Sequence, residues 1–307
     1  MFYSKCVAFA FGFYEQTLKG CNWNMVGVTD ISNRLLISTI AEDAAEIARE
    51  YGLGLEVAEF CTAYNMDIDF SMWDNAVRKK MAGVTRFAFH APFNELCPAA
   101  VDPMIAEVAK KRYAQAAAIM DGYGINAMVV HSGYMQELYH KSWFVEKSVA
   151  FWTEFLSERP EGFRLYLENV FERTPDLLID IVAAVNDKRF RLCLDVGHAA
   201  NRGIEAVGVE YAGAEEAGAG AAGTGDAGAY GWMLRMLPFL NHVHLHNNDG
   251  KRDTHYALGD GIIDMAAFIS GTAAAAPGAT FTIETSHGKT SVEWLIANGF
   301  IPAPAFS

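Results

Sequence analysis

The 307-residue chain has little of several features that mark common protein classes. Its five cysteines are scattered and contain no Cys-x-x-Cys pair, which disfavours a disulfide framework and a cysteine-based zinc site. No segment reaches the roughly 18 to 20 continuous apolar residues needed to span a bilayer. The apolar run from Cys6 to Tyr14 lacks the flanks of a signal peptide, and we interpret it as a buried strand. We therefore expect a cytoplasmic protein with reduced thiols that does not enter a membrane.

Positive charge is also scarce, because 24 Lys and Arg residues face 37 Asp and Glu residues. The net charge of −13 keeps a protein soluble and repels a polyanion from most of its surface. Nucleic acid is therefore a disfavoured partner unless bound metal ions reverse the charge locally. The sequence leaves a homo-oligomer open.

What the chain does contain is a regular alternation of short apolar runs with longer stretches of helical period. This alternation is typical of βα units and a parallel sheet. With 51% hydrophobic residues, the chain is large enough for one barrel-sized core. We predict a single (β/α)8 TIM-barrel domain over residues 1–307. The expected strands are Met25–Thr29, Leu53–Phe60, Arg86–His90, Asn126–His131, Arg164–Glu168, Arg191–Asp195, His242–His246 and Thr280–Thr285.

Amphipathic stretches between these runs predict the helices. Thr39–Tyr51 places Ile40 and Ala44 on one face, and Asp102–Tyr123 and Trp143–Leu156 are similarly patterned. Thr174-Pro175 predicts an N-cap followed by proline at the first helical position, with a helix that runs to about Asn186.

One segment departs from the pattern, because residues 211–229 are almost entirely Ala and Gly. Such a composition buries too little surface to offset its ordering entropy, so it predicts a mobile loop or a weak helix. An active-site lid is one interpretation, and a neutral insertion is the one we favour.

Nine residues of the metal-ligand type lie one or two per βα unit, where a strand meets its loop. A parallel barrel gathers such strand ends at one mouth, where active sites of this fold are built. Imidazole and carboxylate together suit zinc, manganese or iron at a catalytic site. The nine are His90, His131, Glu168, Asp195, His198, His244, Asp253, His255 and Glu284.

Further residues carry weaker signals. His246 shares the alternation of His242 and His244, and it is a substrate-binding candidate and a reserve ligand. Lys251 and Arg252 are candidates for binding a substrate phosphate or carboxylate, with a solvated turn as the alternative. Two interpretations remain for Asp30, Glu56 and Glu59, as substrate contacts or as solvated loop residues. The pattern of strand-end ligands does not include His140 and His287.

Four motifs carry a resemblance to a known family: LENV around Glu168, CLDVGHAAN around Asp195 and His198, VHLHNNDG around His244 and DTHYALGDGIID around Asp253 and His255. From about Met25 to Ser286 the chain resembles the xylose isomerase-like TIM-barrel superfamily, which includes endonuclease IV and many sugar isomerases, epimerases and dehydratases. The last motif is close to the DxHxPLGEGxID pattern of the sugar isomerase/epimerase branch. In that branch, the resemblance implies one divalent ion held by Glu168, Asp195, His244 and Glu284.

Similarity to endonuclease IV implies a larger centre of up to three zinc ions. The first ion would take His90, His131 and Glu168, and the second would take the four residues of the single-ion site. His198, Asp253 and His255 would hold the third. Phe93, after His90, is a weak match to an inserting aromatic residue.

Two enzyme hypotheses follow. The first is a metal-dependent isomerase or epimerase of a small sugar, sugar phosphate or polyol, in which Glu168 and Glu284 exchange protons beside a polarised carbonyl. The second is an endonuclease IV-like zinc phosphoesterase. The acidic surface favours the first. A barrel that only binds a sugar or a metal is a third alternative, and it is disfavoured because so many unpaired ligands are costly without an ion.

Overall fold

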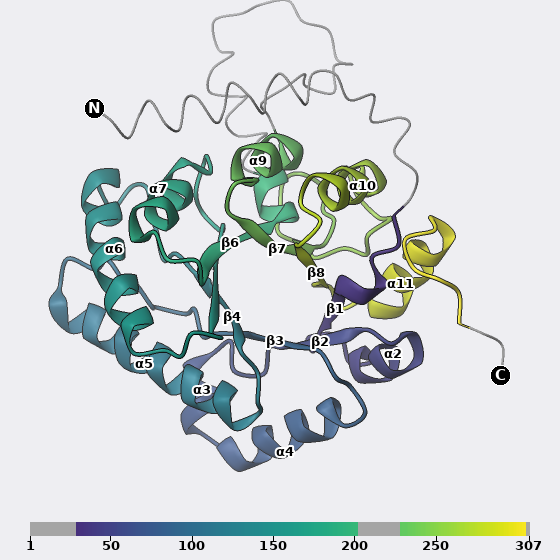
Figure 1. Ribbon diagram of the computed structural model, residues 1–307, viewed down its shortest axis with the longest axis horizontal. Helices are drawn as coiled ribbons and strands as arrows, with labels where there is room; N and C mark the ends of the chain where they lie inside the picture. Colours follow the sequence, from purple (N-terminus) through teal and green to yellow (C-terminus); the bar gives the residue numbers. More distant parts are fainter. Residues whose placement is uncertain (1–28, 202–227, 305–307) are drawn as a thin grey trace, which may run out of the picture.

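The computed structural model describes residues 29–201 and 228–304, and these form a closed barrel of parallel strands (Figure 1). The strands pair in chain order, and Leu36 of β1 pairs with Thr282 of β8 to close the ring. The predicted (β/α)8 barrel is confirmed. The strands are β1 Leu35–Ser38, β2 Gly54–Val57, β3 Phe87–His90, β4 Ala127–His131, β5 Arg164–Glu168, β6 Phe190–Asp195, β7 Leu240–Leu245 and β8 Thr280–Ile283.

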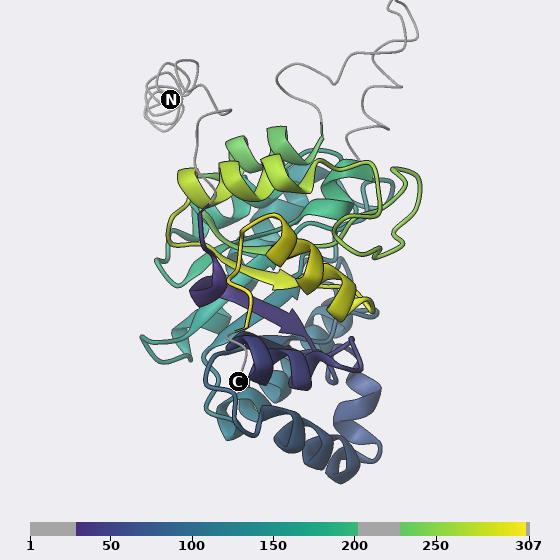
Figure 2. The same ribbon diagram turned by 90° about the vertical axis from the view of Figure 1, so that its right-hand side faces the viewer.

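The helices surround the strands, and α9 and α10 lie side by side in both ribbon views (Figures 1 and 2). A short 3-10 turn, η2 Ser32–Arg34, precedes β1. The α-helices are α2 Ala44–Tyr51, α3 Ala63–Asp67, α4 Phe70–Met81, α5 Pro103–Gly122, α6 Lys141–Ser157, α7 Asp176–Val185, α9 Ala229–Met236, α10 Met265–Ala275 and α11 Gly288–Ala297.

Helix α5 shows how local sequence sets these boundaries. The Asp102 carboxylate accepts a hydrogen bond from the Met104 backbone N–H at 2.8 Å, which satisfies one of the free donors of the first turn. Pro103 occupies the first turn, where its missing N–H costs nothing. The predicted start of α7 is wrong by one residue, because Pro175 stands at the N-cap and the helix begins at Asp176.

The predicted first strand is also wrong. The strand that closes the barrel is Leu35–Ser38, whereas Thr29 lies outside any strand and residues 25–28 lie outside the described part of the chain. All four residues of β1 are buried, so the alternation that marks a half-exposed strand is missing from this short segment. The next helix begins at Ala44 rather than Thr39, and Ile40 is 42% exposed in the loop before it.

The barrel interior holds a small apolar cluster and a buried polar layer. Leu36, Ala88, Val129 and Tyr166 belong to the cluster, and Tyr166 stacks on the ring of His242 at 5.2 Å. Glu56, His242 and Thr282 are fully buried and bonded to one another. Burying such groups is costly unless they are paired, and each of the three has a hydrogen-bond partner within the layer.

Other sequence predictions fall mainly outside the described residues. The run from Cys6 to Tyr14 lies outside them, as does the Ala/Gly-rich segment up to residue 227, and Ala229 begins α9. Cys61, Cys97 and Cys193 are free thiols.

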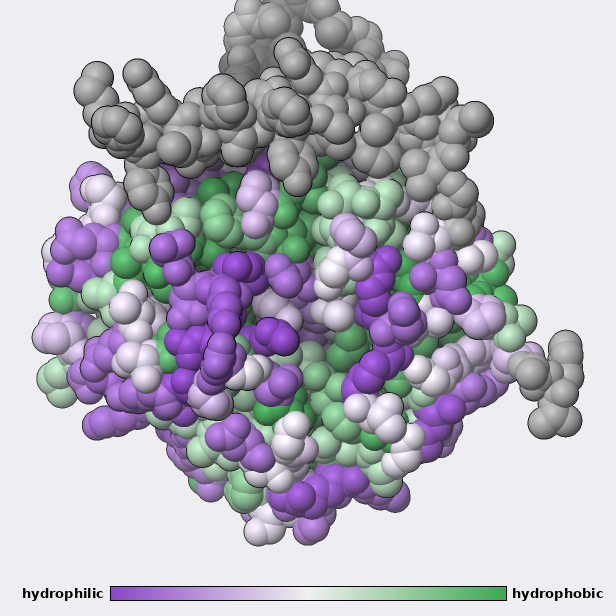
Figure 3. Space-filling model, viewed as in Figure 1, coloured by the Kyte–Doolittle hydropathy of each residue, from purple (hydrophilic) through white to green (hydrophobic). Residues whose placement is uncertain are grey.

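Within residues 29–201 and 228–304, no helix combines the length and the apolarity that a membrane span requires. Hydrophilic residues are spread over the face in Figure 3, broken by smaller hydrophobic areas.

Candidate metal centre at the barrel mouth

The ends of five strands bring the first set of candidate ligands together. His90, His131, Glu168 and Asp195 are the last residues of β3, β4, β5 and β6, and His244 is the second last of β7. In the sheet register His131 pairs with Glu168, and Asp195 pairs with His244. Parallel strands with this register place all five side chains at the same end of the barrel.

The loop after β7 brings two more candidates back over the mouth. Asn247 and Tyr256 exchange backbone hydrogen bonds of 3.1 and 2.8 Å, which closes the loop that carries Asp253 and His255. His255 has a φ of +46°, a conformation that only tight surroundings maintain in a residue other than glycine. The Thr285 hydroxyl donates to the His255 carbonyl at 2.6 Å, and the His255 Nδ1–H donates to the Glu284 carbonyl at 2.8 Å.

The first group of ligand atoms consists of His90, His131 and Glu168. The Nε2 atoms of both histidines lie 3.3 Å from Oε2 of Glu168. The Nδ1–H of His90 donates to the Ala91 carbonyl at 2.9 Å, which directs Nε2 into the group. Phe93 stacks on the ring of His131 with centroids 4.4 Å apart, so it holds this imidazole in place.

The second group consists of Glu168, Asp195, His244 and Glu284, and one ligand atom from each lies within 4.8 Å of the others. His244 Nδ1 lies 3.1 Å from Oε1 of Glu168 and 2.9 Å from Oε2 of Glu284. Glu168 therefore turns one oxygen to each of the first two groups.

Glu56 holds His244 from inside the barrel. Its carboxylate lies 3.1 Å from His244 Nε2, and it also accepts hydrogen bonds from His242 Nε2 at 3.0 Å and from the Thr282 hydroxyl at 2.9 Å. A carboxylate on one imidazole nitrogen fixes the tautomer and makes the other nitrogen a better ligand. Glu56 is thus a positioning residue, and its alternative as a solvated loop residue is excluded because it is fully buried.

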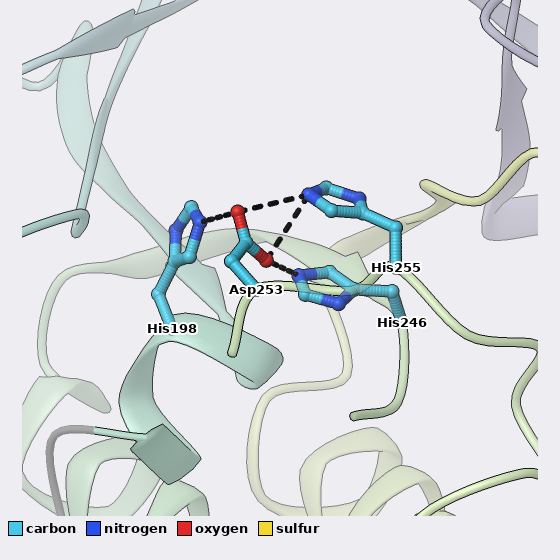
Figure 4. Close-up of side chains that lie close together, drawn as sticks. All are labelled: His198, His246, Asp253 and His255. Atoms are coloured by element: carbon cyan, nitrogen blue, oxygen red, sulfur yellow. Dashed lines mark hydrogen bonds and ion pairs between the residues drawn. The ribbon is translucent and has the colours of Figure 1, made fainter. Parts of the chain in front are cut away.

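The third group lies around Asp253 (Figure 4). Oδ2 of Asp253 lies 3.0 Å from His198 Nε2 and 3.3 Å from His255 Nε2. The Nδ1–H of His198 donates to the Asn169 carbonyl at 3.0 Å, so its Nε2 faces the group. His246, a substrate-binding candidate from its sequence position, lies in this group with its ring parallel to that of His255.

Two observations test whether these residues fit divalent cations. Oε2 of Glu168 and Oε2 of Glu284 are buried and make no hydrogen bond, although histidine nitrogens lie close to both. Within the described residues, the carboxylates of the three groups form ion pairs with histidines and with no lysine or arginine. A buried carboxylate oxygen that makes no hydrogen bond is costly, and imidazole and carboxylate are ligands that zinc and manganese accept. The residues therefore fit divalent ions.

Mutual pairing shifts the pKa values of the site strongly. Burial raises the pKa of Glu168, but His244 and its other histidine neighbours hold that pKa well below its usual range. The same opposition holds the pKa of Asp195 at about 2. Burial lowers the pKa of His255, but Asp253 and further carboxylates raise it to about 9. In the metal-free protein, protons on these histidines balance the charge of the carboxylates. A bound metal ion would supply that positive charge instead, so metal binding would release protons.

The other predicted residues lie differently. Lys251 and Arg252 are exposed in the loop that carries Asp253. Glu59 pairs with Lys80 at 2.8 Å and accepts a hydrogen bond from Thr39, so its contacts are structural. Asp30 is exposed and accepts from the Ser32 backbone N–H in the turn before β1. His140 and His287 stand at the N-caps of α6 and α11.

Sequence reasoning missed the amide residues that hold the ligands. Asn169 donates to the Asp195 carbonyl at 3.0 Å and accepts from its backbone N–H at 2.8 Å. The Asn247 side chain donates to the Leu258 carbonyl at 2.9 Å and anchors the loop after β7. A signal was present, since both asparagines stand within the LENV and VHLHNNDG motifs.

The family comparison covers most of the chain. The family described as xylose isomerase-like TIM barrel matches residues 26–298. The chain belongs to that family. A relative, the uncharacterized protein MJ1311 of Methanocaldococcus jannaschii, is 25% identical over 186 residues. The match spans 57% of this xylose isomerase-like chain and only 56% of that relative.

Solved structures share the fold at low identity. The TTHB071 protein from Thermus thermophilus, in a crystal soaked with ZnCl2, has a TM-score of 0.61 and 21% identity, covering 87% of this chain and 98% of its own. A D-tagatose 3-epimerase-like protein has a TM-score of 0.64 and 19% identity, covering 86% and 96%. Endonuclease IV from Thermus thermophilus has a TM-score of 0.55 and 17% identity, with the same coverages of 86% and 96%. At such identities the likeness shows the fold, and the family's epimerases and endonuclease IV perform different reactions.

Proposed function

We propose that this xylose isomerase-like barrel is a phosphoesterase with a polynuclear divalent-metal centre. The position of Glu168 carries the proposal, because its two oxygens face two different ligand groups. Oε2 lies 3.3 Å from the two histidines of the first group, and Oε1 lies 3.1 Å from His244 of the second. A carboxylate shared in this way suits a pair of neighbouring ions, which a single-ion isomerase does not need.

Bound divalent ions would lower the pKa of water and neutralise the oxygens of a phosphate ester. The protein residues supply position and proton transfer. Glu56, Asn169 and the backbone carbonyls fix the direction of the ligands, so little reorganisation is needed during the reaction. Glu284 is the most accessible carboxylate of the second group, with its side chain 13% exposed, and it fits the role of proton acceptor from an attacking water.

The charge of the chain limits the substrate. A net charge of −13 repels a long polyanion, so the proposal favours a small phosphate ester over nucleic acid. Lys251 and Arg252, which are exposed beside Asp253, would attract an anionic substrate toward the mouth. Zinc or manganese, at one to three ions per chain, is the expected cofactor.

A metal-dependent isomerase or epimerase of a sugar, sugar phosphate or polyol is the second candidate. It is favoured by the second group alone, where Glu168 and Glu284 lie within 3.1 Å of the same His244 nitrogen and could exchange protons with a sugar carbon. The acidic surface supports a small substrate in this case as well.

Substitution of His131 separates the two candidates, because His131 belongs to the first group and not to the second. The full chain would be loaded with Zn²⁺ or Mn²⁺ and assayed with bis-p-nitrophenyl phosphate, p-nitrophenyl phosphate and a panel of ketoses. The proposal predicts phosphate-ester hydrolysis that His131→Asn lowers at least a hundredfold and that Glu168→Gln abolishes.

His140→Asn is the matched control, since His140 is exposed at a helix N-cap, and it should keep full activity. Ketose epimerisation without hydrolysis, retained in His131→Asn and lost in Glu168→Gln, would refute the phosphoesterase and support the second candidate.

A further inference from the structure

His246 occupies the third group in a way that the resemblance to endonuclease IV does not account for. It follows His242 and His244 at a spacing of two, just after β7 ends at Leu245. Alternate residues of a strand share a face, so its ring turns toward the inside of the mouth with those of the other two. The side chain is fully buried, and its Nδ1 makes no hydrogen bond.

The helical segment of residues 196–201, which follows β6, leaves room for the His246 ring at Gly197. A Cβ atom on Gly197 would lie 2.0 Å from Cε1 of His246. Any larger residue at position 197 would therefore push the imidazole out of the group. The Asn248 side chain donates to the Gly197 carbonyl at 2.9 Å and links this helical segment to the residues that follow His246.

Three imidazole nitrogens converge on the Asp253 carboxylate (Figure 4). His246 Nε2 lies 3.7 Å from Oδ1 of Asp253, and the Nε2 atoms of His198 and His255 lie 3.0 and 3.2 Å from its oxygens. One ligand atom from each of the four residues lies within 4.8 Å of the others. Three imidazoles and one carboxylate make a donor set that zinc accepts in four-coordinate sites.

A second contact of His246 offers an alternative role. Its Nε2 lies 3.1 Å from both oxygens of Asp195, so the ring could serve only to orient that carboxylate. Two geometric features argue for a ligand instead. Its ring is parallel to that of His255 with centroids 3.9 Å apart, and both rings present Nε2 to the Asp253 carboxylate. The Asp195 carboxylate is also held without His246, because it accepts a hydrogen bond from the His198 backbone N–H at 2.7 Å.

We propose that His246 is the fourth protein ligand of a divalent ion held by His198, Asp253 and His255. This inference rests on the metal centre of the proposed function and deepens it. Four protein ligands would hold this ion tightly, and the ion would organise the loop after β7. The proposed chemistry needs only the two groups that share Glu168.

The test compares two substitutions that differ in what they retain. His246→Gln keeps a side-chain N–H that can donate to Asp195 but lacks an imidazole, and His246→Ala lacks both. Metal-free protein would be titrated with Zn²⁺ against a chromophoric chelator, and with Co²⁺ followed by its visible absorption. Asp253→Asn, the double variant with His246→Gln, and the control His140→Gln complete the set. Circular dichroism of the metal-free forms verifies folding.

The expected result is that His246→Gln and His246→Ala both lower the affinity for the same ion at least tenfold. Asp253→Asn should weaken binding of that ion too, and the loss in the double variant should differ from the sum of the two single losses, because both residues serve one site. Tetrahedral Co²⁺ absorption should fall in both His246 variants.

Wild-type metal affinity in His246→Gln, with loss only in His246→Ala, would overturn the inference in favour of a residue that orients Asp195. A loss confined to the ion that Glu284→Gln removes would overturn it as well. Neither result affects the proposed function, which fails separately if the wild-type chain binds ions and hydrolyses no phosphate ester.

Discussion

Replacement of Glu56 by glutamine should weaken metal binding without removing any ligand. Glu56 lies within β2, is fully buried, and faces Nε2 of His244 at 3.1 Å, on the side of the ring opposite the second ligand group. A neutral amide in its place leaves the ring less basic and its tautomer less fixed. Carboxylates in this role typically contribute roughly 10- to 100-fold to metal affinity.

That range corresponds to about 1.4 to 2.8 kcal/mol of binding free energy. The shape of the side chain is preserved, so the barrel should remain closed. The histidines beneath the site would nevertheless lose a partner, because Glu56 also accepts from His242 Nε2 and from the Thr282 hydroxyl.

Zn²⁺ affinity of Glu56→Gln would be measured by competition with a chromophoric chelator at fixed pH. Glu59→Gln is the matched control, since Glu59 lies three residues further along the chain but pairs with Lys80 and Thr39. The ion that binds more weakly should be the one whose binding Glu284→Gln also weakens. Unchanged affinity in a folded Glu56→Gln protein, beside a clear loss in Glu168→Gln, would refute the assignment of Glu56 as a positioning residue.

Three further predictions concern stability. Chelation of the metal should lower the melting temperature, and Zn²⁺ at a hundred times its dissociation constant should restore about 2.7 kcal/mol, measured by differential scanning fluorimetry; an unshifted melting temperature would contradict a bound ion. The pKa of His255 is raised from 6.5 to about 9, so its stabilisation of the metal-free protein is complete below pH 6.5 and is lost as pH rises through 9. The pKa of Asp195 is lowered to about 2, so its stabilisation is lost as pH falls from about 4 toward 2. Chemical denaturation of the metal-free chain at pH 6 and pH 9 should therefore show lower stability at pH 9, and equal stability would contradict the pairing of His255. Gly197→Ala should cost about 1–3 kcal/mol by overpacking against His246, and a value near zero would show that the ring moves freely.

The parallel barrel could be predicted from the sequence because most of its strands are short apolar runs separated by long helical stretches. β1 was missed because two short apolar runs, Met25–Thr29 and Leu35–Ser38, lie close together, and the pattern alone does not say which of them pairs with β8. The ends of the helices were set by details such as Pro175 at an N-cap, which pattern alone places only to within a residue or two.

The candidate ligands could be proposed because each stands at the end of a strand in a fold that gathers strand ends at one mouth. Three of the groups in the structure, with Glu168 shared between two of them, contain the residues that the resemblance implies, and their role as metal ligands stays a prediction. Composition alone favoured the small-sugar isomerase, and the geometry of Glu168 moves the preference to phosphate-ester hydrolysis.

The sequence by itself determined the fold class, the family and the chemical type of the site, because these depend on residue kinds and spacings along one chain. Only the tertiary structure decided that Glu56 supports His244 and that His246 joins His198, Asp253 and His255. Both depend on side chains from different strands and loops meeting in the barrel, and residues as far apart along the chain as Glu56 and His244, 188 positions, leave no local pattern of their contact.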